Sequence, residues 1–173
     1  DKAISEHCMS SGINGFSLQT QNLILQEISE SDAGWIVAWR SDPQVYKYFL
    51  KPHPITLREH RHWYYSSYQE DEQRIDMIAM EKGTKWPVGL FGLKKLSSST
   101  AEVNYLLDEE KQGKGYAFEG VRTMIQWAHH SWESKYIIAQ IHRMNKSSIK
   151  LIDRLGFNRD RREGDFLIYI REL

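Results

Sequence analysis

The chain has 173 residues, enough for one domain with a hydrophobic core and too few for two domains of ordinary size. Lys plus Arg and Asp plus Glu both number 23, and this neutral balance disfavours a nucleic acid or another acidic polymer as the partner. The single cysteine, Cys8, excludes an internal disulfide and fits a reducing compartment. No apolar run approaches the roughly 18 residues of a membrane span, and the start does not read as a signal peptide, so we expect a cytoplasmic protein without a membrane partner.

The first part of the chain predicts one strand and two helices. Residues 1–19 are polar, and we expect them to form a loose arm, part of it foreign to the fold, before a single domain over residues 20–173. Residues 23–28 are typical of a strand. Ser29, Ser31 and Asp32 are N-cap candidates for a helix that continues to Trp39 and ends before Pro43. A second helix, over residues 57–70, follows a capping box; its aromatic side chains suit either a core face or a substrate wall.

The rest of the chain alternates strands and helices. Strands are predicted over residues 74–80, 86–96 and 101–107, with a hairpin turn at residues 83–84 and a possible bulge near Gly89 and Gly92. A helix over residues 117–132, a strand over 136–141 and a helix over 145–155 follow, the last stopped by Gly156. Two short strands, at 157–159 and 166–170, complete the pattern. The predicted fold class is therefore mixed α/β.

The glycine-bearing turn between the strand ending at residue 107 and the next helix predicts a phosphate cradle. Gly113 and Gly115 can adopt positive φ, so consecutive backbone N–H groups can converge on an anion. The start of the following helix adds unpaired N–H groups and the positive end of its dipole. The spacing matches neither a dinucleotide-binding fingerprint nor a P-loop.

The turn fits the pattern Q/R-x-x-G-x-G/A through Gln112, Gly115 and Ala117, and this pattern resembles the acetyl-CoA loop of the GNAT N-acetyltransferases. A second motif, beginning at Asn145-x-x-Ser148 and ending at Gly156-Phe157, resembles the Asn helix of the same family. The order of elements from residue 20 to the end is also similar to the GNAT fold. The resemblance implies a mixed central sheet of about seven strands flanked by about four helices. It also implies acetyl-CoA as co-substrate, and many relatives are dimers, which makes a homodimer possible.

The resemblance assigns the cofactor contacts to three segments. The loop would hold the pyrophosphate through its backbone, with Lys114 able to add charge. The strand edge would pair with the peptide-like pantetheine, and one of its N–H groups would polarise the thioester carbonyl. Asn145 and Ser148 would touch the pantetheine arm and the phosphates. The loop and strand residues are Gln112, Gly113, Lys114, Gly115, Tyr116, Ala117, Tyr105, Leu106 and Leu107.

The predicted chemistry is direct transfer of the acetyl group to an amine in a ternary complex. Glu102 alternates with Asn104 on one face of its strand, and the family often keeps a carboxylate here that takes the amine proton through water. The alternatives are a solvent-facing glutamate without such a role, and His142 as base. The family's frequent proton-donating tyrosine is replaced by Ile152, so the donor to the thiolate stays open between Ser148, another side chain, water and unassisted departure.

The segment before the hairpin indicates which branch of the GNAT family the chain resembles. Residues 20–25 followed by Ser-Glu-Ser-Asp are similar to the ribosomal-protein-type GNATs. Residues 39–43, together with His60 and Trp63, resemble the GNATs that acetylate nucleotide-linked amino sugars, such as the pseudaminic acid pathway enzyme. This implies substrate contacts by Arg40, His60 and Trp63, with Asn104 nearby. Arg40 can instead cap its own helix, and His60 can be a surface histidine.

Four functions compete. The leading one is acetylation of a small amine, with a nucleotide-linked amino sugar favoured. The others are acetylation of a ribosomal-protein or peptide N-terminus, acetylation of an aminoglycoside or polyamine, and non-catalytic acyl-CoA binding. The acidic residues 70–72 would suit the positive charge of an aminoglycoside or polyamine. No metal site is indicated, because His60 and His62 are two residues apart and do not share a helix face.

Overall fold

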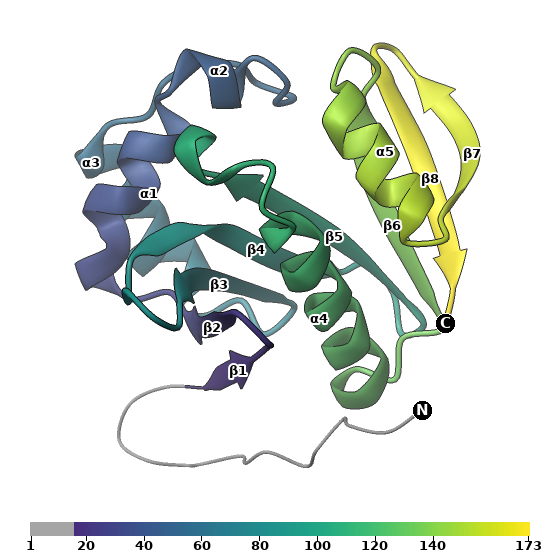
Figure 1. The fold of residues 1–173 in the computed structure, drawn as a ribbon, viewed down its shortest axis with the longest axis horizontal. Coiled ribbons are helices and arrows are strands. Elements are labelled where there is room, and N and C mark those ends of the chain that lie inside the picture. Colours follow the sequence, from purple (N-terminus) through teal and green to yellow (C-terminus); the bar gives the residue numbers. More distant parts are fainter. Residues whose placement is uncertain (1–15) are drawn as a thin grey trace.

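The computed structural model describes residues 16–173, and within them one eight-stranded sheet runs in the order β1-β2-β3-β4-β5-β6-β8-β7 (Figure 1). All neighbouring strands are antiparallel except β5 and β6, which are parallel. The strands are β1 (Ser17–Gln19), β2 (Leu23–Glu27), β3 (Arg74–Glu81), β4 (Pro87–Lys95), β5 (Thr100–Leu107), β6 (Tyr136–His142), β7 (Asn158–Glu163) and β8 (Phe166–Glu172).

Within residues 16–173 five α-helices flank the sheet, and their ends follow the local signals. The helices are α1 (Ala33–Arg40), α2 (Pro43–Tyr46), α3 (Leu57–Trp63), α4 (Tyr116–Ser131) and α5 (Lys146–Arg154). Asp42 caps α2, with Pro43 at the first turn. Thr56 and Glu59 form the predicted capping box of α3, which continues as a π-helical segment (Tyr64–Tyr68). Short 3₁₀ turns lie at Glu30–Asp32 and Glu109–Lys111.

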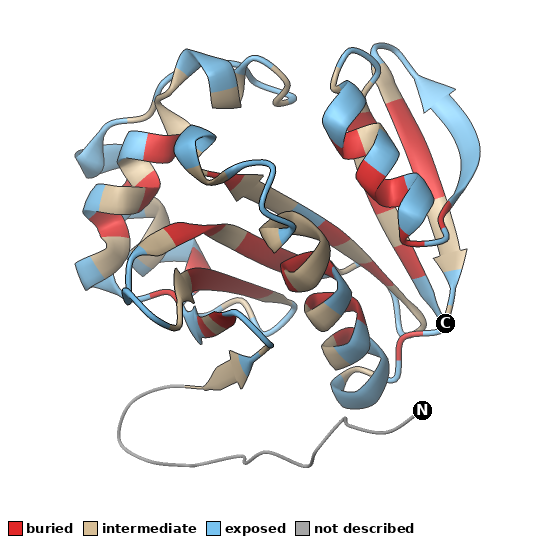
Figure 2. Cartoon of the chain, viewed as in Figure 1, coloured by how far each residue is buried: buried red, intermediate tan, exposed pale blue. Residues whose placement is uncertain are grey.

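The two faces of the sheet carry separate hydrophobic clusters because side chains alternate along each strand. The larger cluster joins Val121 and Met124 of α4 and Leu151 of α5 to Phe91 and Val103 of the sheet. The smaller cluster lies on the opposite face, where α1 and the π-helical segment pack. Its buried members are Ile28, Ile36, Trp39, Tyr68 and Ile78. Figure 2 shows the buried sides of α4 and α5 turned toward the sheet, whereas β7 is exposed along its length.

The sheet opens between β5 and β6. Their pairing covers three residue pairs and ends at Glu102 and Ile138, although both strands continue. Beyond this point the two strands diverge, and β6, β8, β7 and α5 form one side of the opening in Figure 1. A strand edge without a neighbouring strand is therefore left along the second half of β5.

The sheet is larger than predicted at its first edge. Ser17–Gln19, which we placed in the loose arm, form β1 and pair with Ile24–Gln26 of β2. Residues 1–15 of that arm, including Cys8, lie outside the described residues. The predicted bulge is at the start of β4, where the register with β3 shifts opposite Ala79 and Met80. Within the described part of the chain, no helix is long and apolar enough to cross a membrane.

Candidate active site

A cavity of about 1080 Å³ lies at the opening between β5 and β6. Ligand sites in proteins are typically clefts of this kind, with a few polar groups placed on apolar walls. Every predicted site residue lines it except Lys114, which is exposed outside it. The residues in common are Arg40, His60, Trp63, Glu102, Asn104, Tyr105, Leu106, Leu107, Gln112, Gly113, Gly115, Tyr116, Ala117, Asn145 and Ser148.

The glycine turn has the backbone geometry of an anion cradle. Gly113 and Gly115 adopt φ of +77° and +82°, in the left-handed region that disfavours other residues. Gly115 is the N-cap of the 16-residue helix α4, so the unpaired N–H groups of its first turn face the same end of the cavity. An anion placed there would meet these donors together with the positive end of the helix dipole.

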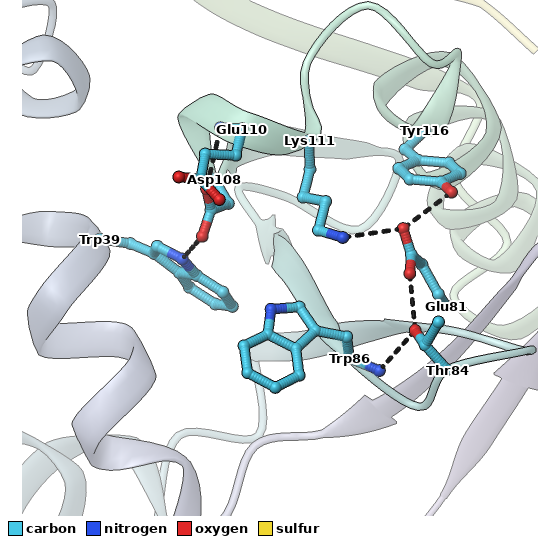
Figure 3. A network of polar contacts seen from close by, with 8 residues as sticks. All are labelled: Trp39, Glu81, Thr84, Trp86, Asp108, Glu110, Lys111 and Tyr116. Carbon is cyan, nitrogen blue, oxygen red and sulfur yellow. Dashed lines mark hydrogen bonds and ion pairs between the residues drawn. The ribbon is translucent and has the colours of Figure 1, made fainter.

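Glu81, at the end of β3, fastens both ends of this turn to the hairpin between β3 and β4 (Figure 3). Its carboxylate accepts hydrogen bonds from Thr84 Oγ1 at 2.6 Å, Lys111 Nζ at 3.1 Å and Tyr116 Oη at 3.0 Å. These donors, Thr84 and Lys111 above all, lower the pKa of Glu81 to about 2. Lys111 precedes the glycines and Tyr116 follows them, so one carboxylate sets the span of the loop.

A second tie in Figure 3 links the loop to α1. Trp39 Nε1 donates to Asp108 Oδ2 at 2.9 Å, and Asp108 Oδ1 accepts from the backbone N–H of Glu110 at 3.0 Å. Trp39 is buried between α1 and the sheet. The loop is therefore held from both sides of the sheet before any ligand binds.

Two cross-strand rows form the floor of the cavity on the α1 side. In one row Arg74, Lys94 and Glu102 are in register, and in the next row Asp76, Gly92 and Asn104. A Cβ atom at Gly92 would lie 2.3 Å from Asp76 Oδ1 and 2.7 Å from Asn104 Oδ1. Because glycine has no side chain, the side chains of Asp76 and Asn104 can both extend over β4 at this position.

The carboxylates of this floor are electrostatically unusual. Burial raises the pKa of Glu102, and the nearby charges of Lys94 and Arg74 oppose the shift. Burial also raises the pKa of Asp76, although Arg74 Nε donates to its Oδ2 at 2.9 Å. A carboxylate whose pKa moves toward neutrality is a better proton acceptor for an amine, and perturbed groups of this kind mark functional sites.

Arg40 and His60 carry buried polar atoms without partners. Among the described residues, Arg40 Nε and His60 Nε2 make no hydrogen bond, and His60 is 3% exposed, which rules out the alternative of a surface histidine. Burial, followed by the neighbouring Arg74, lowers the pKa of Arg40; burial and then Arg40 lower the pKa of His60. Buried polar atoms in proteins are rarely left without a hydrogen-bond partner, so a ligand group in the cavity would supply one. The Trp63 ring lies 5.5 Å from His60.

His142 is poorly placed as a base. Its ring lies between Tyr48, at 5.5 Å, and Phe166, at 5.3 Å. Its Nδ1 accepts a hydrogen bond from the backbone N–H of Met144 at 3.1 Å. His142 also lines the cavity, but its Nδ1 lone pair is already engaged by this hydrogen bond.

On the other side of the opening, Asn145 and Ser148 begin α5. Asn145 is the N-cap, and its Oδ1 accepts from the Ser148 N–H at 3.3 Å. Ser148 Oγ in turn accepts from Tyr105 Oη at 2.7 Å, which joins β5 to α5 across the opening.

A family model described as an acetyltransferase (GNAT) domain matches residues 22–158. The chain belongs to the GNAT acetyltransferase family. The predicted α/β GNAT fold is confirmed; the described part of the chain has eight strands rather than about seven and five α-helices rather than about four.

Two sequence relatives and one solved structure illustrate the likeness. An uncharacterized protein of Methanocaldococcus jannaschii is 29% identical over 83% of this chain, which spans 30% of that relative. The [ribosomal protein uS5]-alanine N-acetyltransferase of Escherichia coli is 26% identical, over 87% of this chain and 82% of the relative. The structure of spermidine N-acetyltransferase from Vibrio cholerae, in complex with CoA and spermine, has a TM-score of 0.80 and 17% identity, covering 87% of this chain and 95% of that one; it shows the shared fold.

In this GNAT domain, four residues at or near the site were not identified from the sequence: Arg74, Asp76, Lys94 and Glu81. The first two carried a signal, since charged residues at alternate positions interrupt the apolar strand of residues 74–80. Lys94 and Glu81 carried none, because their roles depend on partners from other parts of the chain.

Proposed function

We propose that this GNAT N-acetyltransferase moves the acetyl group of acetyl-CoA onto the primary amine of a small molecule that also carries an anionic group, with a nucleotide-linked amino sugar as the favoured class. The observation that supports this most directly is the pair of buried polar atoms Arg40 Nε and His60 Nε2, which have no partner within residues 16–173 and line the same cavity as Glu102. A phosphate oxygen would accept from the Arg40 Nε–H, and also from His60 in the tautomer that carries its proton on Nε2, and guanidinium groups recognise phosphate well.

The charge of the cavity favours the same class of acceptor. Seven Lys and Arg side chains line it among the described residues, against three carboxylates. The cations are Arg40, Lys47, Lys51, Arg74, Lys94, Lys150 and Arg154, and the carboxylates are Asp76, Glu102 and Glu109. Such a lining attracts the phosphates of CoA and an anionic acceptor, and it disfavours a polycation such as a polyamine or aminoglycoside.

The proposed reaction is direct attack in a ternary complex. The loop of residues 112–117 and the first turn of α4 would hold the pyrophosphate, and the open edge of β5 at residues 105–107 would pair with the pantetheine arm. A backbone N–H of this edge would polarise the thioester carbonyl. Glu102 would take the amine proton, directly or through water, as the nitrogen attacks.

Two alternative functions are each supported by a specific observation. A peptide N-terminus as acceptor is supported by the uS5-alanine acetyltransferase among the relatives. A non-catalytic acyl-CoA-binding role is supported by Ile152, which provides no proton where the family frequently has a tyrosine.

The test begins with a thermal shift in acetyl-CoA and continues with thiol release against nucleotide-linked amino sugars, peptides and polyamines. We expect stabilisation, and turnover on the anionic acceptors. Arg40→Gln should raise the acceptor KM by about 10–100-fold, since a charge-assisted hydrogen bond contributes about 1.5–3 kcal/mol, and should leave acetyl-CoA affinity unchanged. Arg58→Gln, on the exposed side of α3, is the matched control. Turnover confined to peptides or polyamines would refute the acceptor class.

A further inference from the structure

The departing sulfur of CoA needs a proton, and the helix that borders the opening supplies no acidic side chain at Ile152, which is fully buried. Helical side chains lean toward the N-terminus of their helix, so a side chain at position 152 extends toward the turn that contains Ser148. Ser148 is 8% exposed and lines the cavity. A hydroxyl group is thus present one turn before Ile152, on the same face of α5.

Ser148 does not act alone, because Tyr105 Oη donates to its Oγ at 2.7 Å. Among the hydrogen bonds of residues 16–173, Ser148 Oγ has no acceptor for its own proton, which can therefore point toward a ligand in the cavity. The Tyr105 ring is held by Phe91, with the ring centroids 6.2 Å apart and the planes inclined by 15°. Burial raises the pKa of Tyr105 to about 12, so the phenol stays protonated at neutral pH.

Strand alternation separates this pair from the proposed base. Glu102 and Asn104 belong to the face of β5 that is covered by α1, whereas Tyr105 packs in the cluster of α4 and α5. An acceptor amine near Glu102 and a sulfur near Ser148 would thus lie on opposite sides of the sheet opening. In the tetrahedral intermediate the attacking nitrogen and the leaving sulfur also occupy different corners. A base on one side of the opening can therefore take the proton of the nitrogen while a donor on the other side gives a proton to the sulfur.

We propose that Tyr105 is the proton source for the leaving thiolate and that Ser148 passes the proton on. This inference rests on the proposed acetyl transfer. As the carbon–nitrogen bond forms and the carbon–sulfur bond breaks, its electron pair goes to sulfur, sulfur takes the Ser148 hydroxyl proton, and Ser148 Oγ takes the proton of Tyr105. The transfer is concerted with bond cleavage because a phenol is a weak acid. The phenolate then regains a proton from water, and Glu102 releases the amine proton to solvent.

The first test compares Tyr105→Phe, Ser148→Ala and the double variant. Tyr105→Phe keeps the ring and its packing on Phe91. We expect each variant to lose about 10–100-fold in kcat, a typical effect of a general acid, with acetyl-CoA KM and melting temperature nearly unchanged. The double variant should be no worse than the poorer single variant, because both act in one relay. Tyr169→Phe removes a buried phenol of β8 that does not line the cavity, and serves as the control. An unchanged kcat with a raised KM would show a merely structural tie and overturn the proposal.

The second test needs no acceptor and uses CoA carrying ¹³C on the carbon bonded to sulfur. NMR titration of the bound CoA reports the pKa of its thiol. A donor at the sulfur stabilises the thiolate, so the bound thiol should titrate about one pH unit higher in Ser148→Ala and Tyr105→Phe than in the unaltered enzyme. Equal titration in all three proteins would overturn the relay even if acetyl transfer is found. If CoA does not bind, the proposed function fails first, and the relay fails with it.

Discussion

At the scale of single residues, the environment of the Glu102 side chain is determined by neighbouring strands as well as by its own strand. It is the last residue of β5 that pairs with β6, so its side chain lies where the sheet begins to open. Burial raises its pKa, and Lys94 and Arg74 in the same cross-strand row limit the rise. A carboxylate whose pKa is raised in this way is more basic than one in water.

Glu102→Gln should lower kcat by about 10²–10⁴-fold, because the amide has the shape of the carboxylate and cannot take a proton. Acetyl-CoA affinity, measured by calorimetry, should stay within about twofold. Since the pKa of Glu102 is raised above its ordinary value, kcat/KM of the unaltered enzyme should fall as the pH drops toward that pKa, and this acidic limb should disappear in the variant. If Glu102→Gln keeps full activity and Asp76→Asn loses it, the base is Asp76.

At the scale of secondary-structure elements, α4 has two roles: its first turn follows the glycine turn, and its buried face packs against the sheet. Gly115 begins the helix, and Gly120, one turn further, lies against β4. A Cβ atom at Gly120 would lie 2.3 Å from Cζ of the buried Phe91. Because Phe91 also stacks on Tyr105, this contact connects the position of α4 to the open edge of β5.

Gly120→Ala should therefore destabilise the fold despite the better helix propensity of alanine. Overpacking of a core typically costs about 1–3 kcal/mol, whereas the propensity gain is at most about 1 kcal/mol. Gly34→Ala in α1 is the control, since no atom lies within 4 Å of its added Cβ. Chemical denaturation should show a lower midpoint for Gly120→Ala and an equal or higher one for Gly34→Ala. An unchanged midpoint for Gly120→Ala would contradict the close contact with Phe91.

The loop before α4 is held by the Glu81 carboxylate, which accepts hydrogen bonds from Lys111 and Tyr116 on either side of the glycines. The pKa of Glu81 is about 2 in the folded chain, below its ordinary value of 4.5, so the unfolded chain takes up the proton first as the pH falls. The contribution of Glu81 to stability is therefore complete above about pH 4.5 and is lost between 4.5 and about 2.

Glu81→Gln should lower the melting temperature at neutral pH, and the difference from the unaltered protein should shrink as the pH approaches 3. It should also weaken acetyl-CoA binding by about 3–10-fold, an effect of about 1 kcal/mol, because the loop then has to be ordered by the ligand. Differential scanning fluorimetry across pH and calorimetry with CoA provide the two measurements. A difference in melting temperature that stays constant down to pH 3 would contradict the assignment to the carboxylate.

At the scale of the whole molecule, the divergence of β5 and β6 is the feature on which the proposed ligand binding depends. We expect hydrogen exchange to be fast at those amides of residues 103–107 that β4 does not pair, and to slow by at least about tenfold when CoA is added. Amides of β8, which pairs with β6 along its full length, should not change and provide the internal control. Protection confined to the glycine loop, with none along β5, would show that the pantetheine arm does not pair with this edge.

The order of the elements, the capping box of α3, the end of α5 at Gly156 and the backbone conformation of the glycine turn could be predicted from the sequence, because each depends on residues within a few positions of one another. The capping box at Thr56 and Glu59 and the positive φ angles of Gly113 and Gly115 are confirmed. The roles assigned to Glu102, Asn145 and the loop residues stay predictions, although all but Lys114 line one cavity. Ser17–Gln19 were wrongly assigned to the arm because so short a strand is defined by its pairing with β2 rather than by its own pattern.

Register and packing, in contrast, were decided by tertiary structure alone. The rows that bring Asp76 beside Asn104 and Arg74 near Glu102 depend on how three strands align, and alternation along one strand does not specify its register against the next. The burial of Arg40 and His60 depends on segments that are separated along the chain. The same is true of the hydrogen bonds from Lys111 and Tyr116 to Glu81 and from Tyr105 to Ser148. Local sequence determines which elements form and which backbone conformation the glycine turn adopts; the side-chain contacts around that turn arise where distant segments meet.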